Sequence, residues 1–166
     1  MSLNAFTASV AVYARLLPNL ATILDKGVAH AAAMKVDTQV LLTARLFPDM
    51  WSLAEQVRAA CNFVVRSSSR LAAVPIPTFD GKDASFDDLE ARIAWSLAHI
   101  KSLDPKAFDG DRTLTFPAGD KQHTMTGTDY LLTFALPNFY FHLTTAYDIL
   151  RHNGVPLVKD DFVGAI

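Results

Sequence analysis

Apolar residues recur at intervals of three and four along four long stretches of this chain, and this spacing limits the possible folds more than any other feature. In the first stretch, from about Leu3 to Lys26, the residues that follow it are Phe6, Val10, Tyr13, Leu17, Leu20 and Leu24. This interval places apolar side chains on one face of an α-helix. The sequence therefore predicts a mainly helical protein.

End signals set the limits of the first helix and of the segment that follows it. Ser2 or Asn4 is expected to cap the helix and Gly27 to end it. Pro18 predicts a kink near residues 15–17, because proline lacks the amide hydrogen that an α-helix uses. Residues 28–47 then read as a long crossover that contains one short helix at about 29–36.

The other three helices and a hairpin follow in order. The second helix is expected from about Pro48 and Asp49 to about residue 73, and the third from Ser85 to about residue 103. Two alternating segments at about 112–126 predict a β-hairpin, and the fourth helix is expected from about 126–128 to Gly154. The predicted fold class is all-α: residues 1–166 form one domain, a four-helix bundle with a long crossover after helix one and a small hairpin before helix four.

Composition excludes several classes of function. The 15 basic and 17 acidic residues are spread along the chain, so we expect no nucleic-acid partner. The single cysteine, Cys61, allows no internal disulfide and reads as a buried, unreactive thiol. The N-terminus does not resemble a signal peptide, and no apolar stretch approaches the roughly 18–20 residues that cross a bilayer. We therefore expect a cytoplasmic protein that does not bind a membrane.

Two polar residues stand out on the fourth helix. Asn138 and His142 are four positions apart and so lie on one helix face, among residues that are otherwise apolar. A buried polar group without a partner costs roughly 1–3 kcal/mol, so this pair needs partners. The pair either helps to form a functional site or is a hydrogen-bonded structural pair in the core.

Three segments carry a resemblance to a known family. They are PDMW at 48–51, WSLAEQV at 51–57 and NFYFHLTTAYDILRHNG at 138–154. Together with the order of the elements, they resemble the DinB/YfiT-like superfamily of four-helix bundles, and within it a subfamily of unknown function. Many members of that superfamily bind a divalent metal through three histidines, one on helix two and two at an H-x-x-x-H spacing on helix four.

The resemblance implies a metal-ligand triad that is incomplete in this chain. His142 keeps one ligand position, whereas Asn138 occupies the second and Ala59, approximately, the third. Divalent first-row metals are typically held by three or four strong donors, so one imidazole and one carboxamide would bind such an ion weakly. We expect no cofactor; zinc or nickel at His142 is the alternative.

The candidate pocket lies between helices two and four. Gln56, Asn138 and His142 are expected to line it, with Trp51 and Tyr140 near its rim. Asp49 is expected to cap helix two; the alternatives are that it pairs with Arg45 or points into the pocket. Such a cluster could hold a water, a small polar ligand or an adventitious ion.

Two functions remain open at this point. The first is a non-catalytic or degenerate DinB-like bundle, either a dimeric interaction protein or a small-ligand-binding protein. The second, which only the resemblance implies, is a metal-dependent hydrolase or thiol transferase with His142 as the retained ligand. A homodimer is expected because helix four is apolar on nearly all sides from Leu131 to Leu150, and because DinB-like bundles often pair.

Two polar segments are interpreted as surface. His99 is expected to be exposed on a helix-three face that it shares with Asp88, Arg92 and Ser96. The run of serines at 67–69 is expected to form a polar, frayed face near the end of helix two.

Overall fold

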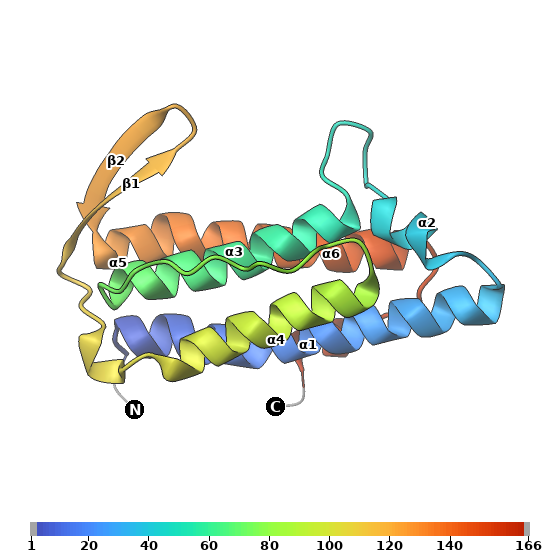
Figure 1. The fold of residues 1–166 in the computed structure, drawn as a ribbon, viewed down its shortest axis with the longest axis horizontal. Coiled ribbons are helices and arrows are strands. Elements are labelled where there is room, and N and C mark those ends of the chain that lie inside the picture. Colours follow the sequence, from blue (N-terminus) through green and yellow to red (C-terminus); the bar gives the residue numbers. More distant parts are fainter. Residues whose placement is uncertain (1–2, 165–166) are drawn as a thin grey trace.

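Helices make up most of the protein, and a small antiparallel sheet of two strands projects from one end (Figure 1). The computed structural model describes residues 3–164. Within them, four helices of 17 residues or more are α1 (Ala5–Met34), α3 (Leu53–Leu71), α4 (Phe86–Ser102) and α6 (Leu136–His152). The shorter helices are α2 (Thr38–Thr43), α5 (Gly127–Asp129), α7 (Lys159–Val163), the 3₁₀ turn η1 (Pro105–Ala107) and the π-helical η2 (Tyr130–Ala135). The mainly helical fold with one hairpin agrees with the sequence prediction, but the chain has more helices than four.

The start of α1 follows the predicted capping, and its end does not. The Asn4 side chain accepts a hydrogen bond from the Thr7 amide, and Thr7 bonds back to the Asn4 backbone. The other proposed cap, Ser2, lies outside the described residues. The helix continues through Pro18 and Gly27 to Met34. A Cβ on Gly27 would lie 3.2 Å from a methyl carbon of Leu150, so this glycine permits a close approach between helices instead of ending one.

The crossover contains its short helix later than predicted. Residues 29–34 belong to α1, and the short helix is α2, which Asp37 caps by accepting a hydrogen bond from the Gln39 amide. The length of α1 therefore shortens the crossover to residues 35–52, with α2 inside it.

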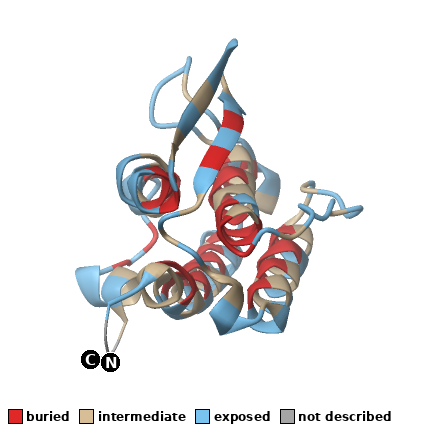
Figure 2. Ribbon diagram, turned by 90° about the vertical axis from the view of Figure 1, so that its left-hand side faces the viewer, coloured by how far each residue is buried: buried red, intermediate tan, exposed pale blue. Residues whose placement is uncertain are grey.

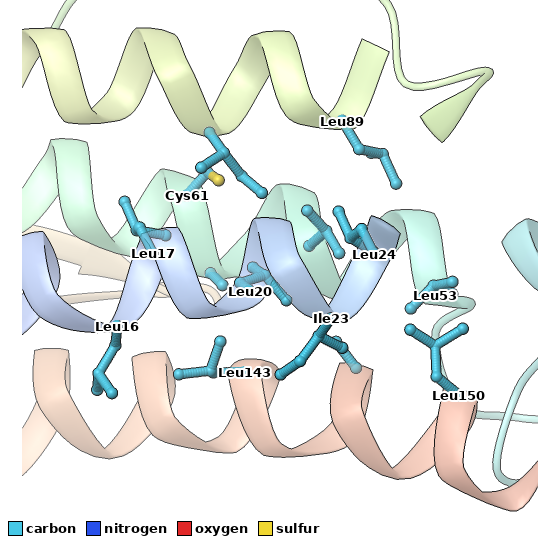
Figure 3. Close-up of a cluster of buried hydrophobic side chains, with 14 of the residues drawn as sticks. Leu16, Leu17, Leu20, Ile23, Leu24, Leu53, Cys61, Leu89, Leu143 and Leu150 are labelled. Carbon is cyan, nitrogen blue, oxygen red and sulfur yellow. The ribbon is translucent and has the colours of Figure 1, made fainter. Parts of the chain in front are cut away.

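The main core lies where α1, α3, α4 and α6 face one another. Figure 2 shows buried residues on the facing sides of the helices, and Figure 3 shows the aliphatic side chains that meet there. Leu17, Leu20, Leu53, Leu89 and Leu150 are all fully buried. Cys61 lies in this core, so its predicted burial is confirmed, and burial raises the pKa of its thiol to about 12.

The hairpin packs on the helices through its own small core. Strands β1 (Thr113–Ala118) and β2 (Lys121–Thr126) pair with Phe116 opposite His123 and turn at Gly119 and Asp120. Phe116 is buried, and its ring centroid lies 4.6 Å from that of Tyr130. The burial of Phe116 holds the hairpin against the helices, because a two-stranded hairpin alone has only marginal stability in water.

The predicted fourth helix is divided by a π-helical turn. Helix α5, the π-helical η2 and α6 follow one another without a break, and the Leu136 amide bonds to the Leu131 carbonyl, five residues back. Pro137 comes directly after this bond and has no amide hydrogen with which to continue an α-helical ladder. A widened turn before a proline accommodates that missing donor.

The two polar segments interpreted as surface are instead part of the interior. Ser67, Ser68 and Ser69 have no exposed area, and Ser96 and Arg92 of α4 are buried as well. Ser67 Oγ lies 2.9 Å from the Tyr13 hydroxyl, and Ser96 donates to the Arg92 carbonyl, whereas the buried Ser68 hydroxyl makes no hydrogen bond to a described residue. His99 is half-buried, and its Nε2 lies 2.8 Å from Ser69 Oγ. Polar residues therefore lie between α3 and α4. The spacing of residues in the sequence predicts a solvent-exposed face at the same positions.

Helix α1 differs from the sequence prediction in one more respect. It is long and apolar enough to span a membrane by length and composition, although no stretch of the sequence was expected to do so. In the structure α1 packs against α4, α7, α3 and α6, as the core helix of a water-soluble protein does. Lys26 of α1 forms a 2.6 Å ion pair with Asp161 of α7, so α1 also anchors the end of the described chain.

Candidate functional site

A hollow of about 290 Å³ opens beside the start of α3 and the middle of α6. Its lining side chains come from the segment before α3, from the first turns of α3 and from α6, and they are Asp49, Met50, Trp51, Gln56, Phe141 and His142. Helices α3 and α6 pack closely along their length. The site thus lies between segments that are about 90 residues apart in sequence.

The start of α3 is fixed by a capping box. Ser52 accepts a hydrogen bond from the Glu55 amide, and the Glu55 carboxylate accepts in return from the Ser52 amide and hydroxyl. These bonds lower the pKa of Glu55. Because the helix begins at Leu53, Trp51 stays outside it at the rim of the hollow, and the buried Gln56 lies in its first turns.

Gln56 and His142 form the centre of the site. The Gln56 Nε2 donates to the Trp51 carbonyl oxygen at 3.3 Å, so its Oε1 is free to accept and lies 2.8 Å from the His142 Nδ1. An amide oxygen cannot donate, so this contact assigns the proton of the imidazole to Nδ1. The Nε2 then carries a lone pair, and it makes no hydrogen bond to any residue from 3 to 164.

Aromatic rings enclose the imidazole. The Trp51 ring is nearly parallel to it at 5.3 Å between centroids, and the Phe63 ring is nearly parallel at 5.7 Å. Phe141 meets it edge-on at 5.3 Å. Burial lowers the pKa of His142 below its ordinary value, so the ring is neutral at pH 7. A neutral, oriented imidazole offers a hydrogen-bond acceptor at Nε2.

The structure brings four of the six sequence-predicted site residues together. Trp51, Gln56, His142 and Asp49 all line the hollow. Asn138 does not line it, because its amide turns back along the helix and donates to the Phe134 carbonyl at 2.7 Å. Tyr140 is exposed and contacts Phe139 rather than the site.

Asp49 has a different role from the predicted cap. Helix α3 begins four residues later, with Ser52 as its cap, so Asp49 stands too far from the helix N-terminus to serve it. Arg45 pairs with Glu55 at 3.2 Å and bonds to the Met50 carbonyl, and so it is not a partner of Asp49. The sequence left three roles open for Asp49. Its position on the wall of the hollow agrees with the third, a side chain that faces the pocket.

Three residues of the site were not predicted from the sequence. Met50 and Phe141 line the hollow, and Phe63 stacks on the imidazole from the next turns of α3. Phe141 has 55% of its surface exposed. Adjacent residues of an α-helix point about 100° apart, so the position of Phe141 next to His142 did not by itself place it at the site.

The three-histidine metal centre does not fit these residues. Of the positions that the resemblance implies, Ala59 has no donor atom in its side chain, and Asn138 does not line the hollow. Among residues 3–164, no three side chains of His, Cys, Asp or Glu lie together in a way that could hold a metal ion. The donor set therefore consists of one imidazole nitrogen, with the Asp49 carboxylate elsewhere on the wall of the hollow.

The chemistry of the hollow favours molecules that donate hydrogen bonds. Its wall offers the His142 Nε2 lone pair and the Asp49 carboxylate as acceptors, and none of its lining residues is Lys or Arg. The aromatic faces of Trp51 and Phe141 add an apolar surface that also attracts cations.

Comparisons with known proteins agree with this fold. The family model described as "Domain of unknown function (DUF1993)" matches residues 5–163. One solved structure, a DinB family member protein from Shewanella denitrificans, is 35% identical to this chain. The match covers 97% of this chain and 92% of that one, with a TM-score of 0.88. No curated protein matches the chain.

Proposed function

The chain belongs to the DUF1993 family and is DinB-like in structure, and from this premise we propose that it is a degenerate, non-catalytic four-helix bundle that binds a small ligand beside His142. On this proposal residues 1–166 act as one domain in the cytoplasm. His142 occupies a position at which many members of the superfamily bind a metal. In this chain we propose that it accepts a hydrogen bond from the ligand instead.

The contact between Gln56 and His142 carries the proposal. It occupies the Nδ1 atom, fixes the tautomer and leaves Nε2 without a protein partner among the described residues. Among the described residues, Nε2 is not one of the fully buried polar atoms that lack a partner, so it can be reached from the hollow. The unused acceptor beside a hollow is what a ligand with an N–H or O–H group would complete.

The ligand class follows from the charges and rings of the wall. The carboxylate of Asp49 and the lone pair of His142 favour an ammonium or a hydroxyl group. Trp51 and Phe141 favour an apolar or planar body next to that group. We therefore propose a small amine with an apolar body as the ligand.

A homodimer is part of the proposal. Phe47, Trp51 and Phe141 are exposed by 64%, 48% and 55%, and two of them line the mouth of the hollow. A second copy that covers these rings would remove apolar surface from water, by about 25 cal/mol for each Å². Sedimentation of the purified protein and of a Phe141→Ser variant tests this: the dimer should weaken in the variant, and a monomeric wild type would contradict it.

Tryptophan fluorescence tests the ligand directly, because the chain has only two tryptophans. In a Trp95→Phe variant, Trp51 is the sole indole, and we expect benzylamine to change its emission in a saturable way. Benzoate, which presents acceptors instead of donors, should leave it unchanged. Asp49→Asn should weaken benzylamine binding, and Thr144→Ala, an exposed change on α6, should not. No saturable response to benzylamine would reject the proposed ligand class.

Metal analysis separates the proposal from the alternative enzyme. Protein purified without an affinity tag should contain zinc and nickel well below one ion per chain. Near-stoichiometric metal that is lost in a His142→Ala variant would support a metal-dependent hydrolase or thiol transferase instead. Circular dichroism of the variant shows whether it still folds, so that metal loss can be assigned to the missing ligand.

A further inference from the structure

A second hollow lies on a different side of α3, between this helix, the loop at 72–85 and α4. Its volume is about 240 Å³, and its wall contains three arginines, Arg58, Arg66 and Arg92. No Asp or Glu is among its lining residues. It therefore differs in charge from the hollow beside His142, whose lining residues include a carboxylate and no lysine or arginine.

Arg92 is built into the floor of this hollow. Its side chain is 8% exposed, and its Nε and Nη2 donate to the two carboxylate oxygens of Asp83 at 2.5 and 2.9 Å. The guanidinium carbon lies 4.3 Å from the centre of the Phe79 ring. The third nitrogen, Nη1, donates no hydrogen bond to a residue from 3 to 164. A buried guanidinium thus keeps one donor unused at the wall of a hollow.

Two further arginines and an amide approach from α3. Arg58, Asn62 and Arg66 are spaced four residues apart, so they line one side of the helix, and all three face the hollow. Arg66 forms no ion pair within the described part of the chain. The carboxylate nearest to Arg58 is Glu55 at 4.0 Å, which also pairs with Arg45 at 3.2 Å. Positive charge is therefore in excess around the hollow.

Apolar and aromatic groups complete the wall. The rings of Phe79 and Trp95 lie 5.2 Å apart with a tilt of 55°, and Ile76 and Pro77 border the same space. A ring or short apolar chain can pack on these groups while an attached anion reaches the arginines. The planar fork of arginine matches the two oxygens of a carboxylate or phosphate.

We propose that this hollow binds a small organic anion, a carboxylate or phosphate attached to an aromatic or apolar body. The volume is below the roughly 300–1,000 Å³ of sites for drug-sized molecules, so the ligand is small. Arg92 holds the anion through its unused Nη1, Arg58 and Arg66 neutralise it, and Trp95 and Phe79 contact its body. The site is independent of the one proposed beside His142.

A structural role explains only part of this arrangement. The bidentate pair of Arg92 and Asp83 braces the loop against α4 without any ligand. It does not account for Arg66, which adds positive charge to the same space and has no acidic partner there. A bound anion would supply the counter-charge that Arg66 lacks, and this attraction would favour binding.

The experiment uses the Trp51→Phe protein, in which Trp95 is the only indole. Benzoate, phenyl phosphate and inorganic phosphate are titrated separately while Trp95 emission is recorded. We expect a saturable change with benzoate or phenyl phosphate and a weaker response to inorganic phosphate, which lacks the apolar body. The two organic probes show whether the site prefers a carboxylate or a phosphate. Higher salt should weaken either, because it screens the arginines.

A matched pair of variants locates the binding. Arg66→Gln, an exposed change that leaves the Arg92–Asp83 pair intact, should weaken binding by about tenfold or more, as expected for a lost charge-assisted hydrogen bond. Arg151→Gln, an exposed change on α6, should leave it unaltered. Equal effects of the two would show only nonspecific attraction and overturn the proposal. So would the absence of any saturable response at about 10 mM probe, ten times a Kd of 1 mM.

Discussion

The Nδ1 atom of His142 lies 2.8 Å from the Oε1 atom of Gln56, although 86 positions separate the two residues. The contact joins α6 to the first turns of α3, and it decides which ring nitrogen carries the proton. A single hydrogen bond thus links the packing of two helices to the chemistry that the hollow can offer.

Removing the acceptor should destabilise the protein more than removing both partners. Gln56→Met leaves the buried His142 Nδ1 unpaired, which should lower the free energy of unfolding by about 1–3 kcal/mol. The double variant Gln56→Met/His142→Leu should recover part of this loss. Urea unfolding of the two single variants and the double variant gives the coupling energy; strict additivity would show that the pair does not interact.

The stability should fall as the pH decreases below about 6.5, partly because of His142. Burial lowers the pKa of His142 and of His99 in the folded protein from an ordinary value of 6.5. Above pH 6.5 both states are neutral and nothing is lost. Below it the unfolded chain takes up protons first, until the pH reaches the lowered folded values. One such proton changes the free energy of unfolding by at most about 1.4 kcal/mol per pH unit.

Variants assign this pH dependence to its groups. In His142→Gln the loss of stability between pH 7.5 and 5.5 should be smaller than in the wild type, and His99→Gln should remove a further part. Carboxyl groups contribute equally to all three proteins, so the differences report the histidines. An unchanged pH profile in both variants would contradict the neutral, buried state of the two rings.

Two fully buried leucines of the main core should be sensitive to truncation. Leu53 of α3 and Leu150 of α6 are fully buried, so Leu53→Ala and Leu150→Ala should each cost about 2–5 kcal/mol. Leu132 is 54% exposed, and its replacement by alanine should cost no more than about 0.5 kcal/mol. Denaturant unfolding measures all three; a small loss at Leu53 or Leu150 would mean that its face is misassigned.

Local signals in the sequence predicted much of the fold. The Asn4 cap, the hairpin with its turn at Gly119 and the long apolar helices depend on neighbours within four residues, and such signals can be read directly. The meeting of Gln56 and His142 could also be anticipated, because each lies on an inward face of its helix. The local signals need no knowledge of which helices pack together, whereas the meeting of Gln56 and His142 also required the expected pairing of helix two with helix four.

Features that depend on tertiary contacts could not be read in the same way. Gly27 usually signals a helix end, but here Leu150 approaches too closely for a side chain, and the helix continues. The serines at 67–69 look like surface until α4 packs on α3, and Arg92 looks like surface until the loop that carries Phe79 and Asp83 covers it. Asn138 sits four residues from His142 as expected, yet its own helix supplies a nearer acceptor, so it does not reach the site.

The buried ion pair beside the second hollow should matter more than an exposed one. Asp83→Asn leaves the Arg92 guanidinium without its counter-charge at 8% exposure, which should cost about 3–5 kcal/mol. Lys26→Gln breaks a pair whose lysine is 40% exposed, and it should cost at most about 1 kcal/mol. Thermal and urea unfolding compare the two. Equal losses would show that Arg92 gains enough contact with solvent to need no partner.

The ring nitrogens of His142 give the most direct test of the ligand site. In ¹⁵N NMR spectra of the free protein at pH 7.5, Nδ1 should carry the proton and Nε2 should show the signal of an unprotonated nitrogen. Addition of benzylamine should shift the Nε2 signal in a saturable way and leave Nδ1 protonated. An Nε2 that carries the proton in the free protein, or one that does not respond to benzylamine, would contradict the proposed site.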